Sequence, residues 1–154
     1  QGDARRAHDD LVAAGGVVQR WSEGCLANAE VVVDAIFGTG LSRPLDAGMI
    51  ERINAINDCG APILSLDIPS GLDADTGAVW GAAILAERTL SFIGLKLGFY
   101  LGEGPNHTGI VLFDDLDLPA CDRCTVLIGH PSLELTSRAL REERARSQYE
   151  CDCR

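Results

Sequence analysis

The chain has little positive charge. It holds 13 lysine and arginine residues against 23 aspartate and glutamate residues, for a net charge of −10, and Lys96 is its only lysine. The first 120 residues contain no cluster of basic side chains. A protein that binds nucleic acid needs such clusters to neutralise phosphate groups. The sequence therefore predicts no nucleic-acid partner.

Long apolar runs are also absent. No apolar segment approaches the roughly 20 residues of a membrane-spanning helix. Charged residues interrupt the first ten positions at Arg5, Arg6, Asp9 and Asp10, unlike a secretory signal. The hydrophobic content of 46% is sufficient for the core of one domain. We therefore expect a soluble cytoplasmic protein with no membrane partner.

Several familiar catalytic motifs are missing as well. The segment Gly38–Arg43 begins like the dinucleotide fingerprint of NAD-dependent oxidoreductases, but Arg43 stands where that fingerprint has its third glycine. No P-loop sequence is present, and Ser70 lacks the flanking glycines of a nucleophile elbow. These absences argue against a P-loop nucleotide hydrolase and a serine hydrolase, and they leave an oxidoreductase as a weaker alternative.

Six cysteines are scattered along the chain. Cys121 and Cys124 have the spacing of half a zinc site or of a redox pair, but Cys151 and Cys153 are too close together to form a good second half. The sequence favours incidental thiols in a reducing compartment over a metal site.

What the chain does have is one pattern that occurs twice. The apolar run Val31–Val33 leads into Asp34 and then a glycine-bearing loop, and Ala61–Leu66 leads into Asp67 and a second such loop. Apolar residues at helical spacing in Met49–Ile56 predict a helix between the two strands. A strand, a helix and a strand in this order form a right-handed crossover, so both aspartates are expected at one edge of a parallel sheet.

Further elements follow from the same patterns. The sequence predicts helices over Asp3–Ala14, with Asp3 as the cap, and over Leu135–Glu150, short strands over Val17–Trp21, Thr89–Ile93 and Gly109–Phe113, and a loop over Gly94–Gly104.

Three side chains in and after these loops have two interpretations each. Asp34 either accepts backbone hydrogen bonds at a strand end or, with Ser70, supplies hard oxygen ligands to a potassium-like ion. Asp73, at the start of a loop with a weak likeness to a calcium site, is better interpreted as an Asx-type turn. Lys96 either reaches a phosphate or is a solvated loop residue.

Three segments closely resemble consecutive blocks of the NAD(P)H-hydrate epimerase family, the YjeF N-terminal domain. They are DAIFGTGLSRPL at 34–45, SLDIPSGLDADTG at 65–77 and SFIGLKLGFYLGEGPNHTG at 91–109. The resemblance implies an α/β fold, a Rossmann-like three-layer αβα sandwich with a mainly parallel sheet. It also implies an isomerase that interconverts the R and S forms of hydrated NADH and NADPH, in repair of nicotinamide nucleotides.

The same resemblance implies roles for individual residues. Asp34 resembles the catalytic, potassium-binding aspartate of the family, Ser70 a second potassium ligand, and Asp67 an aspartate that contacts the substrate. The substrate loop of the family corresponds to Gly38, Thr39, Gly40, Leu41, Ser42, Arg43 and Pro44. The expected cofactor is therefore a potassium ion.

The resemblance covers residues from about 2 to 119, so we expect a partial epimerase domain at 1–119 and a tail of unknown role at 120–154. Family members carry an Asn-Asn-Gly-Gly-Asp-Gly loop near their start, and because it does not occur here we expect a chain that begins inside the domain, without its first strand or strands. Expected partners are a hydrated nicotinamide nucleotide, an NAD(P)H-hydrate dehydratase, fused or separate, and a second copy in a homodimer. The alternatives are a non-catalytic nucleotide-binding or interaction module of the same fold and an inactive fragment.

Overall fold

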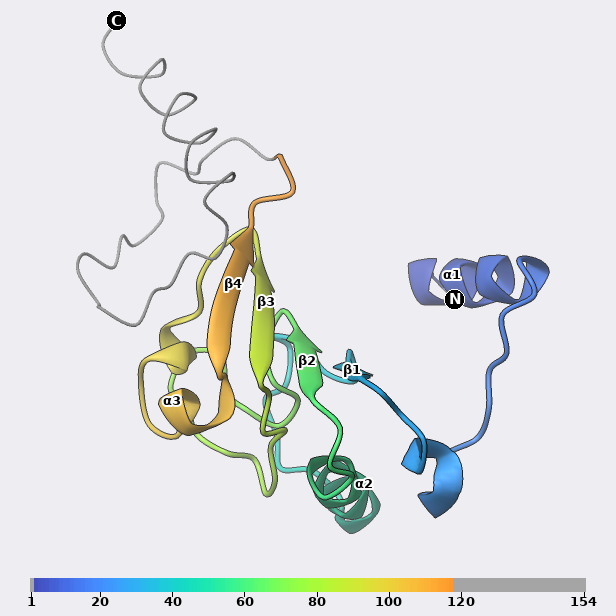
Figure 1. The fold of residues 1–154 in the computed structure, drawn as a ribbon. Helices are drawn as coiled ribbons and strands as arrows, with labels where there is room; N and C mark the ends of the chain where they lie inside the picture. The colour runs from blue at the N-terminus through green and yellow to red at the C-terminus, as the bar shows by residue number, and fades with distance from the viewer. Residues whose placement is uncertain (1, 118–154) are drawn as a thin grey trace, which may run out of the picture.

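A four-stranded parallel sheet forms the centre of the structure, a computed structural model that describes residues 2–117 (Figure 1). The strands lie side by side in chain order, and every neighbouring pair is parallel. Their bounds are β1 Val32–Asp34, β2 Ile63–Leu66, β3 Arg88–Phe92 and β4 Ile110–Asp114. The expected α/β fold with a parallel, Rossmann-like sheet is confirmed.

The crossover between the first two strands is a helix, as the sequence predicted. Helix α2 spans Ala47–Asn57, and the Asp46 side chain caps it by accepting the Met49 N–H at 2.8 Å. An aspartate at this position satisfies a backbone donor that has no partner inside the helix. The cap explains why the helix begins two residues before Met49, where the apolar spacing alone placed its start.

Helix α2 packs against the first two strands through a buried apolar cluster. Ile53 and Ile56 of the helix contact Ile63 of β2 and Ile84 of the following loop, with Val32 of β1 at the margin. A second cluster contains Ile68, Leu72, Ala83 and Phe99, and Val111 of β4 packs against it. Leu45, from the loop after β1, packs against the first cluster, and the second cluster includes residues of the loop after β2.

One row of the sheet is polar although it is buried. Asp34 of β1 lies opposite Ser65 of β2, and Ser65 lies opposite Thr89 of β3. All three residues are at most 2% exposed. Because side chains alternate between the two faces of a strand and neighbouring parallel strands are in register, the three residues share one face. Asp34, the proposed catalytic residue, therefore belongs to a buried polar row inside the sheet.

The remaining short elements connect or flank the strands. They are helix α1 Asp3–Ala13, the single 3-10 turns η1 Glu23–Leu26 and η2 Leu97–Phe99, and the one-turn helix α3 Gly104–His107. In Figure 1 helix α1 lies apart from the sheet, and none of its residues is buried. No helix within residues 2–117 is long and apolar enough to cross a membrane.

Two local predictions about the N-terminal part are wrong. Residue Gly2, with no side-chain hydrogen bond, occupies the cap of α1, and Asp3 lies inside the first turn. Residues Val17–Trp21 form no strand, since a strand needs a neighbour to pair its backbone groups and no described segment pairs with them.

The strand expected at 61–66 begins two residues later, at Ile63, and the predictions after it agree with the structure to within a residue. The strands expected at 89–93 and 109–113 are β3 and β4, each displaced by one position. The loop expected at 94–104 is irregular except for η2 and the first residue of α3. The helix expected at 135–150 and the cysteines from Cys121 onward lie outside the described residues.

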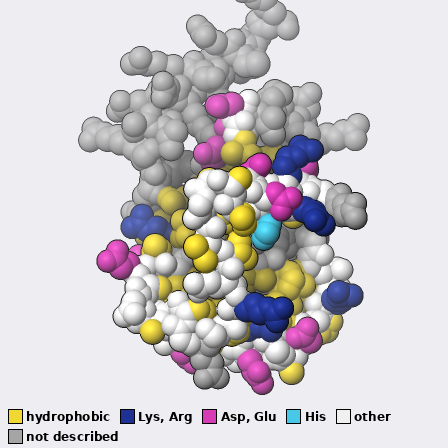
Figure 2. All heavy atoms as spheres, turned by 90° about the vertical axis from the view of Figure 1, so that its right-hand side faces the viewer, with side chains coloured by type: hydrophobic (Ala, Val, Ile, Leu, Met, Phe, Trp, Pro, Cys, Tyr) yellow, Lys and Arg dark blue, Asp and Glu magenta, His cyan; other side chains and the backbone are white. Residues whose placement is uncertain are grey.

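The surface of the described region agrees with the low basic content. Figure 2 shows one face, on which the lysine and arginine side chains are scattered, several of them close to acidic ones, and form no continuous patch. The ion pairs Arg5 with Asp9 and Arg88 with Glu87 are both largely exposed. A phosphate backbone would find no concentrated positive charge on this face.

Candidate functional site

Two aspartates meet at the carboxyl edge of the sheet. Asp34 is the last residue of β1, and Asp67 follows the last residue of β2 directly. The strands are parallel and adjacent, with Asp34 opposite Ser65, so Asp67 lies two positions beyond that pair at the same edge. The shared edge is what the crossover pattern in the sequence predicted, and it is where open α/β sheets bind ligands.

Asp34 is closed off from solvent and surrounded by donors. Its carboxylate is 2% exposed and accepts hydrogen bonds from the Ser65 hydroxyl at 2.9 Å, the Ser70 hydroxyl at 2.6 Å and the Ser70 N–H at 2.8 Å. The N–H of Ile36 is a fourth donor, at 3.3 Å. A carboxylate has about four acceptor positions, so the protein itself occupies all of them.

Ser70 connects the two strand ends. Its hydroxyl donates to Asp34 and accepts from the Phe37 N–H at 2.9 Å, while the Phe37 carbonyl oxygen lies 3.4 Å away. The loop after β1 and the loop after β2 are therefore joined through one side chain. The structure brings Asp34 and Ser70 together, as their proposed common role requires.

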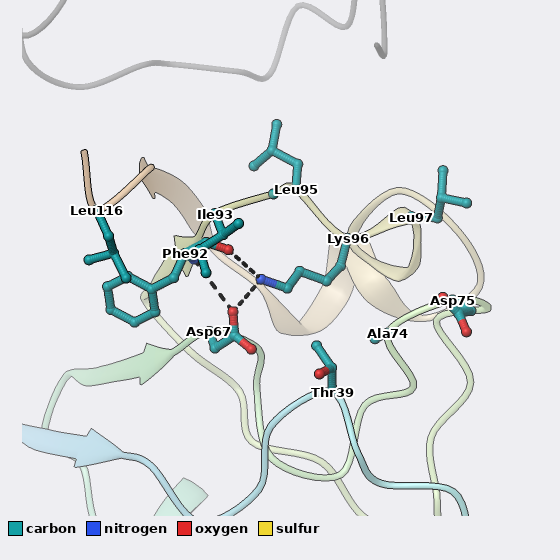
Figure 3. Close-up of a pocket in the computed structure, with 11 residues that line it drawn as sticks. Thr39, Asp67, Ala74, Asp75, Phe92, Ile93, Leu95, Lys96, Leu97 and Leu116 are labelled. Atoms are coloured by element: carbon teal, nitrogen blue, oxygen red, sulfur yellow. Dashed lines mark hydrogen bonds and ion pairs between the residues drawn. The ribbon is translucent and has the colours of Figure 1, made fainter. Parts of the chain in front are cut away.

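Asp67, in contrast, lines an open cavity of about 870 Å³ (Figure 3). Thr39 from the first loop and Asp75 from the second also line it, together with Lys96 and the apolar side chains that follow β3. Asp34 and Ser70 are not among the lining residues. Of the predicted site residues, Asp67 and Thr39 are thus the ones that a ligand in this cavity would meet directly.

The other residues of the predicted substrate loop surround this position. A Cβ atom added to Gly38 would lie 3.7 Å from Oδ2 of Asp67, so the loop passes close to the carboxylate. Leu41 is half-buried, and the remaining four, Gly40, Ser42, Arg43 and Pro44, are exposed. The structure therefore places the start of the loop beside Asp67 and the rest at the surface.

Of the two interpretations of Lys96, the structure contradicts the solvated loop residue. Its side chain is 12% exposed and forms an ion pair with Oδ1 of Asp67, whose own side chain is 29% exposed. The ammonium group also donates to the Ser91 hydroxyl and to the Phe92 carbonyl oxygen, each at 3.0 Å. Lys96 is therefore not a solvated loop residue, and its ammonium group is paired within the protein at the wall of the cavity.

The loop at Asp73 is a set of Asx-type turns, as the sequence indicated. Oδ1 of Asp73 accepts from the Asp75 N–H at 3.1 Å, the Thr76 N–H at 2.8 Å and the Thr76 hydroxyl at 2.7 Å. The Thr76 hydroxyl, followed by the Thr76 N–H, lowers the pKa of Asp73 below its usual 3.8. Residues 2–117 contain no group of three His, Cys, Asp or Glu side chains that could hold a metal ion.

Two members of the site, Ser65 and Ser91, were not predicted from the sequence. Ser65 donates to Asp34, and strand alternation would have placed it on the same face, one strand away. Ser91 accepts from Lys96 and donates to the Gly94 carbonyl oxygen at 2.9 Å. No pattern in the sequence indicates the Ser91 contact, because it depends on how the chain turns after β3.

Comparison with known sequences identifies the family of this chain. The family described as "YjeF-related protein N-terminus" matches residues 1–98. This chain belongs to that family. The match includes both aspartates, the loop between them and Lys96, while β4 lies beyond its end.

Relatives of this family member carry two kinds of name. An NAD(P)H-hydrate epimerase of Levilactobacillus brevis is 41% identical over 98 residues, 64% of this chain and 46% of the relative. An NAD(P)H-hydrate epimerase of Achromobacter xylosoxidans is 42% identical over 118 residues, 74% of this chain and 55% of the relative. The bifunctional NAD(P)H-hydrate repair enzyme Nnr of Vibrio cholerae is 37% identical over 114 residues, 74% of this chain and 23% of the relative. The chain thus spans about half the length of these relatives or less.

The side chains of this family member suit a hard monovalent cation in their chemistry. Asp34 and Ser70 offer carboxylate and hydroxyl oxygens, and the Phe37 carbonyl oxygen lies beside Ser70. Every acceptor position of Asp34 already has a protein donor. An ion bound to Asp34 would therefore replace one of these hydrogen bonds.

Proposed function

We propose that this chain is part of an enzyme that epimerises the hydrated forms of NADH and NADPH, converting the R and S forms into one another. The observation that carries the proposal is the meeting of Asp34, Asp67 and the loop that begins at Gly38 at one edge of the sheet, beside a cavity. The names of relatives in the family support the same reaction.

In the proposed reaction Asp34 is the general acid and base. Inversion at the hydroxyl-bearing carbon of the hydrated nicotinamide ring requires its bond to oxygen or to nitrogen to break and to form again on the opposite face. A carboxyl group within hydrogen-bond reach can take up and return the proton that is transferred in this exchange. Asp34 is enclosed by Ser65 and Ser70, so the substrate must approach past Ser70 and the loop that starts at Gly38. This loop, from Gly38 to Pro44, is proposed to bind the nucleotide.

Asp67 is the proposed contact for a hydroxyl group of the substrate. It lines the cavity, and its Oδ2 atom faces the Gly38 side. An ionised carboxylate accepts hydrogen bonds but repels phosphate. The phosphates of the nucleotide are therefore proposed to lie away from Asp67.

Potassium is proposed as the cofactor, held by Asp34 and Ser70. The oxygen donors of these side chains are of the kind such an ion prefers. When bound, the ion would supply a positive charge that stabilises negative charge on nearby oxygen atoms. Ser70 has a second task without it, because it orients the Asp34 carboxylate through two hydrogen bonds.

The proposed function also includes partners, a location and a domain boundary. The bifunctional relatives support a functional link to an NAD(P)H-hydrate dehydratase. A homodimer, a cytoplasmic location and a domain over residues 1–119 followed by a separate tail belong to the same proposal.

A non-catalytic nucleotide-binding module is the second candidate, and the burial of Asp34 favours it. A carboxylate that is 2% exposed with four protein donors can serve as a structural group alone. Such a module would bind the nucleotide in the cavity and leave the epimer ratio unchanged. The two candidates therefore differ in one measurable property.

The deciding experiment measures epimer exchange with the full-length protein. Purified R hydrate of NADPH is incubated with wild type, with Asp34→Asn and with the surface control Asp58→Asn, and the S form is quantified by chromatography. We expect exchange with wild type and Asp58→Asn and none with Asp34→Asn, whose folding is checked by circular dichroism. No exchange with wild type would leave the binding module as the function. Exchange by Asp34→Asn would remove Asp34 from the acid and base role.

A further inference from the structure

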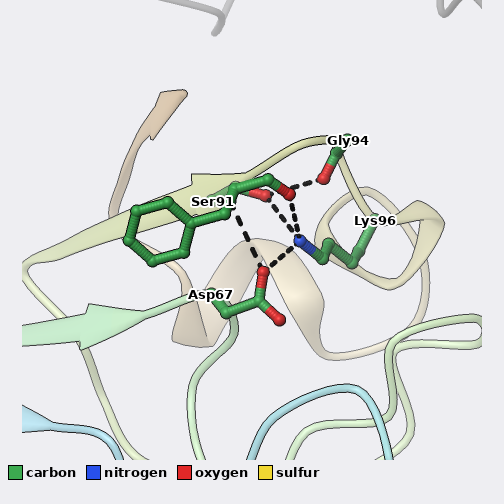
Figure 4. Close-up of polar contacts among 5 residues, drawn as sticks. Asp67, Ser91, Gly94 and Lys96 are labelled. Carbon is green, nitrogen blue, oxygen red and sulfur yellow. Dashed lines mark hydrogen bonds and ion pairs between the residues drawn. The ribbon is translucent and has the colours of Figure 1, made fainter. Parts of the chain in front are cut away.

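Lys96 has no hydrogen left for a ligand. A lysine ammonium group carries three N–H donors, and Figure 4 shows three acceptors around it: Asp67, the Ser91 hydroxyl and the Phe92 carbonyl oxygen. A direct contact with a substrate phosphate would require one of these bonds to break. All three N–H donors of Lys96 are therefore used in hydrogen bonds within the protein.

The ion pair leaves Asp67 with one bound and one open oxygen atom. Oδ1 accepts from Lys96 and from the Phe92 N–H at 3.4 Å. Oδ2 has no hydrogen bond to any of residues 2–117 and lies near Gly38, and in Figures 3 and 4 it points away from Lys96. The pair thus fixes which oxygen a ligand in the cavity would meet.

The backbone is strained at Asp67 itself and at Ile93, which follows the last residue of β3. Asp67 has a φ of 70° and Ile93 a φ of 64°, and a β-branched residue such as isoleucine rarely adopts this left-handed region. Strain of this kind persists where surrounding contacts enforce it, and it is concentrated at functional sites. Lys96 binds Asp67 after β2 and Phe92 at the end of β3, so it joins the two strained strand ends.

We propose that Lys96 is a positioning residue that acts through Asp67. It holds the carboxylate turned so that Oδ2 accepts a hydrogen bond from a hydroxyl group of the substrate, on the ribose or on the hydrated ring. This inference rests on the proposed epimerase function and adds to it a residue that does not itself contact the substrate. Its chemistry requires a ligand that presents a hydroxyl donor at Asp67.

The test is a double-mutant cycle in the full-length protein. Lys96→Met, Asp67→Asn and the double variant are compared with wild type by the kcat and KM of epimer exchange. We expect each single variant to lose on the order of 10²-fold in kcat, the usual effect of a group displaced by about 1 Å. The kcat of the double variant should be no lower than that of the less active single variant, because the effects of residues that act as one unit are not additive.

A direct phosphate contact by Lys96 gives a different result. The losses of the two single variants would then multiply in the double variant, and Lys96→Met would raise KM while kcat stays near wild type. Either outcome overturns the proposal. Arg88→Met is the matched control, since it removes one positive charge from an exposed side chain at the opposite end of β3, and it should leave both constants unchanged.

A crystal structure of Lys96→Met tests the inference without the reaction. We expect the Asp67 carboxylate to rotate from the orientation seen in wild type, and an unchanged carboxylate would overturn the positioning role. This readout separates the two failures, because absence of exchange in wild type contradicts the epimerase function while the Asp67 orientation still decides the role of Lys96. If Lys96→Met does not fold, Lys96→Gln replaces it, because glutamine keeps hydrogen-bond donors without the charge.

Discussion

Asp34 and Asp67 occupy equivalent places at the ends of neighbouring strands, but the protein balances their charges in different ways. Neutral donors surround Asp34: two serine hydroxyls and two backbone N–H groups. A single cation, Lys96, compensates Asp67. The first arrangement closes a carboxylate inside the sheet, and the second keeps one open to a cavity.

The difference follows from where the partners come from. The partners of Asp34 lie on the next strand and on the loops that follow the two strands, so the fold of two strands is enough to enclose it. The partner of Asp67 comes from the loop after a third strand, 29 residues further along the chain. One aspartate is therefore part of the core, while the other depends on a loop that can be altered separately.

Replacement of Asp34 is expected to have the largest effect on stability. Asp34→Ala leaves the hydroxyls of Ser65 and Ser70 and the Ser70 N–H buried without the carboxylate acceptor, which should lower the free energy of unfolding by about 3–5 kcal/mol. Urea denaturation at neutral pH measures the loss. Asp58→Ala, at an exposed position after α2, is the control and should stay within about 0.5 kcal/mol of wild type. A loss below about 1 kcal/mol for Asp34→Ala would mean that water replaces the carboxylate, and the contrast with Asp67 would disappear.

Replacement of Asp67 should affect stability less than function. Asp67→Asn keeps a residue type that tolerates a left-handed backbone, and Lys96 keeps its bonds to Ser91 and Phe92. We expect a loss of about 1 kcal/mol in the free energy of unfolding, as for a partly exposed ion pair, measured by the same urea denaturation.

Asp67→Ala is the matched variant for the backbone. Alanine does not tolerate the φ of 70°, so this change should cost about 1–2 kcal/mol more than Asp67→Asn. Equal stabilities of the two variants would show that the backbone at Asp67 relaxes when the ion pair is removed. A loss for Asp67→Asn as large as that for Asp34→Ala would remove the distinction between a core carboxylate and a cavity carboxylate.

The sequence predicted the framework of this site well. The β-branched run before Asp34, the apolar run before Asp67 and the helical spacing between them determine a parallel crossover. These signals are local and repeated, and the crossover handedness is nearly invariant. The shared edge of the two aspartates could therefore be expected from the amino-acid sequence alone.

Other features depend on contacts that are not local. Val17–Trp21 has strand-forming residues but no strand, because propensity does not replace a paired neighbour. The partner of Lys96 could not be predicted, since the ion pair needs the left-handed backbone at Asp67 and the turn after β3. In both cases the outcome depends on which segment lies alongside, and residue type alone does not determine that.

A third aspartate, Asp73, gives the smallest expected effect and serves as an exposed reference for the other two. Thr76 lowers its pKa first through the hydroxyl and then through the backbone N–H. A lowered pKa in the folded state stabilises the protein above the usual value of 3.8, and this contribution is lost as the pH falls through 3.8 to the lowered pKa. The stability difference between wild type and Asp73→Asn should therefore shrink over that range.

Urea denaturation of both proteins at a series of pH values measures this difference. Thr76→Val removes the hydroxyl that contributes most to the lowered pKa of Asp73, so it should remove part of the pH dependence. A difference that stays constant down to the lowest pH would mean that the turn does not depend on the charge of Asp73. Asp73 accepts hydrogen bonds from neutral donors, as Asp34 does, but in an exposed loop. The type of donor is therefore the same at both positions. A small loss of stability on replacing Asp73 and a large loss on replacing Asp34 would then be due to burial.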